Sequence, residues 1–217
     1  MARRGPGDRK QRGSAPRSGA SGGYDRKDSF YRRAKAEGFR SRAAYKLQEI
    51  AERQPILTRG SRVLDLGCWP GGWLQVAVGR VGPAGTVVGI DLRETEPVTG
   101  ARILRGDVLE AATLDALREA VPGGRFDVIL ADLSPSLSGI RARDEARAAE
   151  LNAMTLATAD ELLAPGGSLV MKVFMDGETE ETLRAARRLF AAVRLTGLDA
   201  SRKGSAEHYL IARDRRR

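Results

Sequence analysis

The stretch VLDLGCWPGGW, residues 63–73, decides the fold of this chain. A short apolar run over residues 62–66 is typical of a buried strand, and it leads into a turn rich in glycine. Residues 72–81 then have the spacing of a helix. Glycine in such a turn lets the backbone pass close to a ligand, and the first N–H groups of a helix can bind polar ligand atoms. We therefore expect a strand–turn–helix unit with a ligand site at its turn.

The glycine spacing of this turn favours one cofactor over another. The turn has the pattern G-x-x-x-G-G from Gly67 to Gly72, with Asp65 two residues before the first glycine. Dinucleotide sites carry G-x-G-x-x-G instead. The pattern favours S-adenosylmethionine over a cofactor that contains a pyrophosphate. It also weighs against the alternative of an NAD-dependent oxidoreductase.

Strands and helices alternate on both sides of this unit. A helical pattern runs over residues 28–52, with Ser41 as its N-cap, and the helix over residues 144–163 ends at Pro165-Gly166-Gly167. This alternation predicts an α/β, doubly wound, Rossmann-like fold with a mostly parallel seven-stranded sheet and helices on both faces. The predicted strands are 62–66, 86–91, 101–105, 126–131, 168–174, 193–197 and 208–212, and the other predicted helices are 72–81, 113–120 and 178–192.

Composition bounds the class of protein. The 217 residues are 41% hydrophobic, which suits one domain with an extension, and no apolar run approaches the roughly 18–20 residues that cross a bilayer. No secretory signal is recognisable. The single cysteine, Cys68, allows no internal disulfide, and with one histidine, His208, a zinc site is not expected. We expect a cytoplasmic protein without membrane or metal, in which His208 is a structural or surface residue.

The positive charge is concentrated at one end of the chain. Residues 1–42 hold 13 Lys/Arg against 4 Asp/Glu, and residues 43–217 hold 24 of each. Residues 1–28 are rich in Gly, Ser, Pro and Arg, so we predict a disordered basic arm there and a single domain over residues 29–217. A basic arm binds a polyanion through counterion release, which favours nucleic acid over a purely solubilising tail.

Charged side chains also mark the ends of the predicted strands. In open α/β sheets ligands bind beyond the carboxyl ends of the strands. There Asp91 is expected to accept hydrogen bonds from ribose hydroxyls, Asp107 to contact an adenine amino group, and Asp132 to face the pocket mouth. Lys172 lies within the apolar strand LVMKVF, residues 169–174, and a lysine there is costly to bury unpaired. We therefore predict that Lys172 pairs with Asp132.

Five sequence motifs follow one another along the chain. They are SRAAYKL over residues 41–47, DLGCWPGGW over residues 65–73, the loop of Asp132 with its Ser-Pro and Ser138-Gly139, LVMKVF over residues 169–174, and Ser201-Arg202 with Ser205-x-Glu207-x-Tyr209. In this order they resemble the FtsJ/RrmJ family of RNA ribose 2′-O-methyltransferases. The resemblance covers nearly all of the chain after residue 28, and it implies the class I S-adenosylmethionine-dependent methyltransferase fold.

The resemblance also implies a reaction centre and a substrate. The Lys-Asp-Lys-Glu tetrad of the family falls on Lys46, Asp132, Lys172 and Glu207, with Lys46 in a helical extension over residues 29–60. The bacterial single-domain members, which are the most similar, act on the A-loop uridine of large-subunit ribosomal RNA. A ribosomal RNA or large-subunit partner and a monomer are thus expected. The cofactor contacts of the family fall on Gly71, Trp73, Asp91, Asp107 and Asp132.

Departures and alternatives remain. Cys68-Trp69 fills two turn positions that are usually small in the family, and Ser136 replaces a common Asn, which affects the pocket shape and the RNA footprint. A transfer-RNA substrate, a small-molecule or protein substrate, and a non-catalytic RNA-binding ribosome-assembly protein are the alternatives. The basic arm and the two lysines weigh against a small-molecule or protein substrate, and the complete tetrad weighs against a non-catalytic role.

The chemistry suits a ribose hydroxyl. A 2′-hydroxyl must lose its proton as it attacks the methyl group, and a lysine acts as base only when its pKa falls well below about 10.4. Desolvation and a second nearby cation lower the pKa of a lysine. We predict that Lys172 is the base, that Lys46 orients the hydroxyl, and that Asp132 and Glu207 hold the two ammonium groups.

Overall fold

The computed structural model describes Met1 and residues 29–136, 138–201 and 207–217. Except for Met1, the predicted disordered arm over residues 1–28 lies outside these ranges. The motif residues Arg202 and Ser205 also lie outside them. The elements are α1 Ser29–Ala36, α2 Ala43–Arg53, β1 Arg62–Leu66, α3 Gly72–Val81, β2 Thr86–Asp91, β3 Ala101–Arg105, α4 Ala111–Glu119, the 3₁₀ turn η1 Pro122–Gly124, β4 Phe126–Ala131, α5 Arg141–Leu162, β5 Leu163–Phe174, α6 Thr179–Leu189, β6 Phe190–Thr196 and β7 Glu207–Arg215.

The seven strands form one sheet in the order β3-β2-β1-β4-β5-β7-β6. The strands β1 to β5 pair in parallel, and β7 runs antiparallel between β5 and β6. The strand order reverses between β1 and β4, so the carboxyl ends of these two strands border a crevice in which ligands of such sheets bind. The mostly parallel seven-stranded sheet is as predicted.

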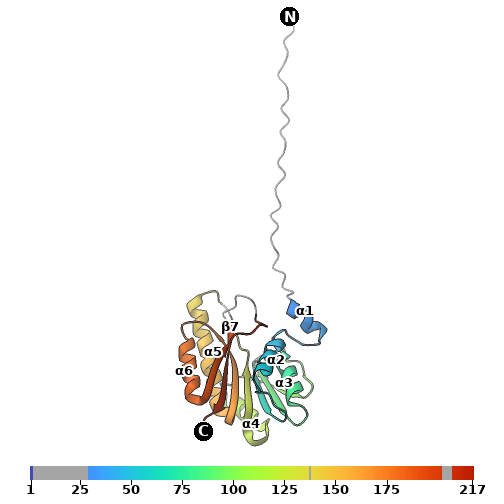
Figure 1. Ribbon diagram of the computed structural model, residues 1–217, viewed down its shortest axis with the longest axis vertical. Coiled ribbons are helices and arrows are strands. Elements are labelled where there is room, and N and C mark those ends of the chain that lie inside the picture. Colours follow the sequence, from blue (N-terminus) through green and yellow to red (C-terminus); the bar gives the residue numbers. More distant parts are fainter. Residues whose placement is uncertain (2–28, 137, 202–206) are drawn as a thin grey trace.

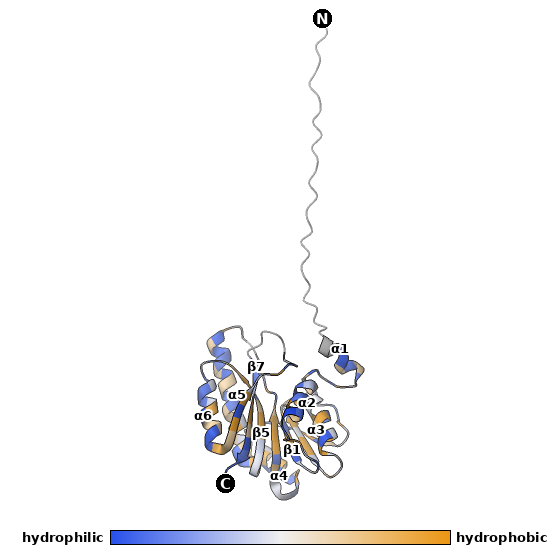
Figure 2. Cartoon of the chain, viewed as in Figure 1, coloured by the Kyte–Doolittle hydropathy of each residue, from blue (hydrophilic) through white to orange (hydrophobic). Residues whose placement is uncertain are grey.

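Helices cover both faces of the sheet (Figure 1). The helices α2 and α3 pack on one face, over a core that includes Leu47, Trp73 and Tyr209. On the other face, α4, α5 and α6 cover a second core that includes Leu117 and Phe126. Figure 2 shows the apolar residues on the central strands and on the inner sides of these helices. Burial on two faces explains why β1, β4 and β5 are continuous apolar runs in the sequence.

Five predicted elements, β1, α3, β2, β3 and β4, have the predicted bounds. The prediction for Pro165-Gly166-Gly167 was wrong, because α5 ends at Leu162 and these residues lie within β5. Leu163 is extended and pairs with Phe126, and the register shifts before Val128. The pairing of Leu163 with β4 therefore ends α5 before Pro165 is reached.

The N-terminal helical pattern is divided into two helices. The backbone turns at Gly38, where φ is +77°, a left-handed conformation that favours glycine. The predicted N-cap was also wrong, because Arg42 precedes α2 and makes no side-chain capping hydrogen bond. Ser41 instead lies against Gly72 at the start of α3. None of the helices in the described part of the chain combines the length and the apolar character that a membrane-spanning segment requires.

Candidate active site

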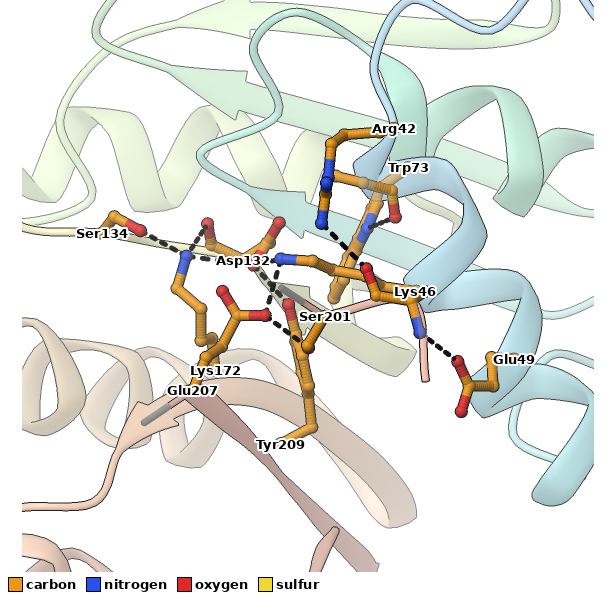
Figure 3. A network of polar contacts seen from close by, with 12 residues as sticks. Arg42, Lys46, Glu49, Trp73, Asp132, Ser134, Lys172, Ser201, Glu207 and Tyr209 are labelled. Atoms are coloured by element: carbon orange, nitrogen blue, oxygen red, sulfur yellow. Dashed lines mark hydrogen bonds and ion pairs between the residues drawn. The ribbon is translucent and has the colours of Figure 1, made fainter. Parts of the chain in front are cut away.

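Four charged side chains converge at the carboxyl ends of the central strands (Figure 3). Lys172 Nζ lies 3.1 Å from Asp132 Oδ1. Lys46 Nζ lies 2.7 Å from Glu207 Oε1 and 3.9 Å from Asp132 Oδ1. The carboxylate of Asp132 is therefore placed between two ammonium groups, and the predicted pairing of Lys172 with Asp132 is present.

Strand register brings these residues together. Asp132 follows the last residue of β4, and Lys172 is on the neighbouring strand, one residue beyond the pair formed by Ala131 and Met171. Glu207 begins β7, where it pairs with Phe174 of β5. Side chains from three adjacent strand ends thus share one edge of the sheet.

Lys46 reaches this edge from a helix. It is buried on α2, only 8% exposed, with Leu47 as its buried neighbour. The Trp73 indole Nε1 on α3 donates to the Ala43 carbonyl at 2.7 Å and holds the start of α2. The side chain of Arg40 donates to the carbonyls of Pro70, Glu96 and Pro97 at 3.3, 2.6 and 2.5 Å, which ties the segment before α2 to the glycine turn.

The ammonium group of Lys172 has three acceptors. It donates to the backbone carbonyl of Asp132 at 3.0 Å and to the hydroxyl of Ser134, and it faces the Asp132 carboxylate. An ammonium has three N–H donors, so these contacts satisfy it in a site where the residue is only 7% exposed. Burial is tolerated here because every donor has a partner.

Tyr209 belongs to the same network, although sequence reasoning assigned it no role. Its hydroxyl donates to Asp132 Oδ1 at 2.6 Å, and its ring is fully buried. Burial, together with the nearby carboxylates of Asp132 and Glu207, raises the pKa of Tyr209 above its ordinary value. The phenol therefore stays protonated and orients Asp132. The signal for it in the sequence was its place two residues after Glu207.

The carboxylate of Glu207 stays ionised despite its burial. Burial alone would raise the pKa of Glu207, but the hydrogen bond and charge of Lys46 reverse this and hold that pKa below its ordinary value. Ser201 Oγ also donates to Glu207 Oε1 at 2.8 Å. The adjacent residue His208 pairs with Val173 in the sheet and does not line either of the two large cavities at this edge.

Among the described residues, two large adjoining cavities open at this edge. The reaction cavity, of about 720 Å³, is lined by all four tetrad residues and by Trp73. The second, of about 530 Å³, is lined by Asp91 and Asp107 and is named here the cofactor cavity. Both cavities share a wall made of Gly67, Ser134 and Pro135.

The predicted cofactor residues are therefore divided between different places. Asp91 and Asp107 line the cofactor cavity, and Asp132 and Trp73 line the reaction cavity. Gly71 lines neither. At its φ of +108°, a Cβ would lie 3.0 to 3.1 Å from the side chains of Val98 and Arg40, so this glycine permits close packing against the segment before α2.

Asp65 in the first strand lacks a hydrogen-bond partner for one oxygen. It is 2% exposed, lines the reaction cavity, and its Oδ2 makes no hydrogen bond within the described residues. Burial raises the pKa of Asp65 well above its ordinary value, and Asp132 and Asp91 add to this. A cation bound against this oxygen would lower that pKa and supply the missing partner, so Asp65 fits the positively charged end of a ligand. Sequence reasoning noted this acid but gave it no contact.

Comparisons with known proteins agree with this arrangement. The model of the FtsJ-like methyltransferase family matches residues 39–215. The ribosomal RNA large subunit methyltransferase E of Natronomonas pharaonis is 45% identical over 190 residues, which are 88% of this chain and 75% of the relative. The protein of the same name from Syntrophobacter fumaroxidans is 46% identical over 190 residues, 87% of this chain and 95% of the relative.

Solved structures agree in fold. A Plasmodium falciparum protein assigned as a ribosomal RNA methyltransferase superposes with a TM-score of 0.74 at 25% identity, over 82% of this chain and 98% of that one. Aeropyrum pernix fibrillarin with bound S-adenosyl-L-methionine gives 0.56 at 16% identity, over 80% of this chain and 74% of that one. The predicted class I methyltransferase fold is confirmed. From the family match and these identities, the chain belongs to the FtsJ-like methyltransferase family, whose members depend on S-adenosylmethionine.

Proposed function

We propose that this chain methylates a ribose 2′-hydroxyl of large-subunit ribosomal RNA, at the A-loop uridine that the resemblance implies. The observation that carries the proposal is the carboxylate of Asp132 held between the buried ammonium groups of Lys46 and Lys172. The names of the relatives that are 45–46% identical support ribosomal RNA as the substrate.

The residues present fit S-adenosylmethionine. Asp91 and Asp107 in the cofactor cavity suit the ribose hydroxyls and the adenine amino group. Asp65, with its unsatisfied oxygen in the wall of the reaction cavity, suits the ammonium of the methionine part. At Gly67, where φ is +72°, a Cβ would collide with the side chain of Leu133. The glycine therefore keeps the shared wall of the two cavities thin.

The chain then acts on the hydroxyl. The bound cofactor supplies a methyl group on a positively charged sulfur, which becomes a neutral thioether when the methyl group is transferred. Lys172 acts as the base in its neutral amine form: its Nζ takes the proton of the 2′-hydroxyl as the hydroxyl oxygen bonds to the methyl carbon, and Lys172 is left as an ammonium group. The hydroxyl of Ser134 already contacts Nζ, so this position accepts an alcohol oxygen, and the substrate hydroxyl replaces that of Ser134.

The remaining residues position and stabilise. Lys46 supplies a second positive charge in the same cavity, which stabilises negative charge that develops on the attacking oxygen. Glu207 holds Lys46, and Tyr209 holds Asp132. Much of the rate comes from fixing the hydroxyl in line with the methyl group, because the donor is already activated.

Ribose methylation mapped across ribosomal and transfer RNA, in a strain that lacks this gene, tests the proposal. We expect one A-loop mark to disappear and to return when the wild-type gene is restored. An intact A-loop mark would contradict the substrate, and a lost transfer-RNA mark would assign the transfer-RNA alternative. With purified protein, RNA that carries a 2′-deoxyribose at the target is expected to bind without accepting a methyl group, and methylation of that RNA would exclude the hydroxyl as acceptor.

A further inference from the structure

Trp69 is an exposed aromatic residue at the reaction cavity. Its exposed fraction is 49%, whereas the other tryptophan, Trp73, is 4% exposed. Among the large hydrophobic residues that are exposed in the described part of the chain, Trp69 alone lines the cavity that contains the tetrad. An exposed indole beside a reaction centre loses contact with water only when a ligand covers it, so it is a candidate for substrate binding.

Asp91 and Arg93 hold Trp69 in place. The backbone N–H of Trp69 donates to Asp91 Oδ2 at 2.9 Å, and that of Arg93 donates to Asp91 Oδ1 at 2.8 Å. The guanidinium carbon of Arg93 lies 4.8 Å from the centre of the Trp69 ring. One carboxylate thus fixes both members of a cation–π pair, and Arg93 occupies one face of the indole.

The position of Trp69 indicates which ligand it meets. It lines the reaction cavity and not the cofactor cavity, where Asp91 and Asp107 suit the adenosine part. The methionine part of the cofactor carries no ring that could stack. A flat group that stacks on Trp69 would therefore come with the molecule that brings the hydroxyl.

We propose that Trp69, backed by Arg93, is a stacking platform for a base of the RNA substrate. This inference rests on the proposed function, because it requires an RNA acceptor. A ribose can enter the reaction cavity only if its nucleotide leaves the helical stack, and its base or the adjacent base then loses stacking partners. An aromatic face restores such contacts and tolerates any base, because every base has a π face.

Three substitutions of Trp69 in the full-length chain separate stacking from simple bulk. Trp69→Ala and Trp69→Leu should raise the KM for an A-loop transcript roughly 5- to 150-fold, the range that corresponds to one lost base–aromatic stack. Trp69→Phe keeps an aromatic face and should stay within about 3-fold of wild type. The kcat at saturating RNA should change little, and the salt dependence of RNA binding should keep its slope, because no charge is removed.

Controls identify the affected step. The hydrogen bond to Asp91 comes from the backbone of Trp69, so the substitutions leave it in place, and the Kd of S-adenosylmethionine by calorimetry should stay unchanged. Ile140, which is 61% exposed and lines neither of the two cavities, supplies the matched control Ile140→Ala, with an unchanged RNA KM expected. Quenching of tryptophan fluorescence by RNA should be strong in wild type and weak in Trp69→Phe.

Several results would contradict the proposed stacking role of Trp69. An unchanged RNA KM in Trp69→Ala excludes the contact, and equal behaviour of Trp69→Leu and Trp69→Phe excludes stacking. A raised Kd for the cofactor would assign the ring to the cofactor site. Failure of the proposed function is a different observation, because then the wild-type protein itself would not methylate RNA.

Discussion

Asp132 is the residue on which the other side chains of the reaction centre depend. Lys172, Lys46 and the hydroxyl of Tyr209 all contact its Oδ1, at 3.1, 3.9 and 2.6 Å. One carboxylate therefore positions the proposed base, the second cation and the buried phenol together, so these groups should behave as a unit under mutation.

Lys172→Ala removes the proposed base. We expect kcat to fall at least about 10²-fold, within the 10²–10⁴ range typical of general acid–base catalysis. The Kd of S-adenosylmethionine should change little, because Asp91 and Asp107 line a different cavity. Single-turnover methylation and calorimetry measure the two quantities. Near-native turnover in this variant would assign the base to another group, whereas loss of cofactor binding would indicate a structural role.

The ion pair of Glu207 with Lys46 predicts a stability difference that depends on pH. Because the pKa of Glu207 is lowered in the folded protein, its contribution is present above the unfolded value of about 4.3 and is lost as pH falls through the folded value. Glu207→Gln should therefore lower the free energy of unfolding by about 1–3 kcal/mol at pH 7, and by progressively less as pH falls below the unfolded value of about 4.3.

Urea unfolding at several pH values measures this difference. Glu119→Gln is the matched control, because Glu119 is exposed and has no ion pair in the described part of the chain, and its effect should stay within about 0.5 kcal/mol. A Glu207→Gln difference that does not shrink at any pH down to acid unfolding would exclude the linkage.

Only part of this site is predictable from the sequence. Asp132 and Lys172 are marked by a strand end and by the cost of burying a lysine, which are local signals. Lys46 and Glu207 required the family resemblance, because their contacts depend on how α2 and β7 dock. The role of Tyr209 follows from the register that pairs it with Lys172, and register is set by tertiary structure.

At the scale of elements, the predicted bounds are correct where the local sequence pattern and the tertiary packing favour the same structure. The strands β1 to β4 and the helix α3 have the predicted bounds, because apolar runs and glycines define both of their ends. The helix α6 was predicted to extend to residue 192 but ends at Leu189. Phe190, only 1% exposed, is extended and pairs with Arg215, so sheet pairing overrides the helical pattern.

The helix α2 serves as the carrier of Lys46, and its docking can be tested through Leu47. This side chain is fully buried in the core shared with α3. Leu47→Ala should lower the free energy of unfolding by about 2–5 kcal/mol, and Leu47→Met by less than about 1.5 kcal/mol. Urea unfolding gives both values. At a temperature where all variants are folded, kcat should fall more than cofactor affinity in Leu47→Ala, and an equal fall of both would contradict α2 as a separate carrier.

At the scale of the whole molecule, the net positive charge and the reaction centre belong to different parts of the chain. Residues 43–217, which include the complete tetrad, have no net charge, and the excess of nine positive charges belongs to residues 1–42. Long-range attraction of RNA depends on net charge, whereas the reaction depends on a few buried pairs. Affinity and catalysis are therefore expected to respond to different parts of the chain.

Deletion of residues 1–28 tests this separation. These residues carry eight Lys/Arg against three Asp/Glu, so their removal should weaken RNA binding and flatten the slope of log K against log salt concentration. Titrations of labelled RNA between about 50 and 200 mM salt measure that slope. Single-turnover methylation at saturating RNA should stay within about 3-fold of the full-length chain, because no tetrad residue is removed.

A full-length variant in which the eight Lys/Arg of residues 1–28 are replaced by Gln is the control for chain length and should match the deletion. An unchanged salt slope would show that the basic segment does not contact RNA, and the neutral remainder of the chain would then have to supply the attraction through local patches.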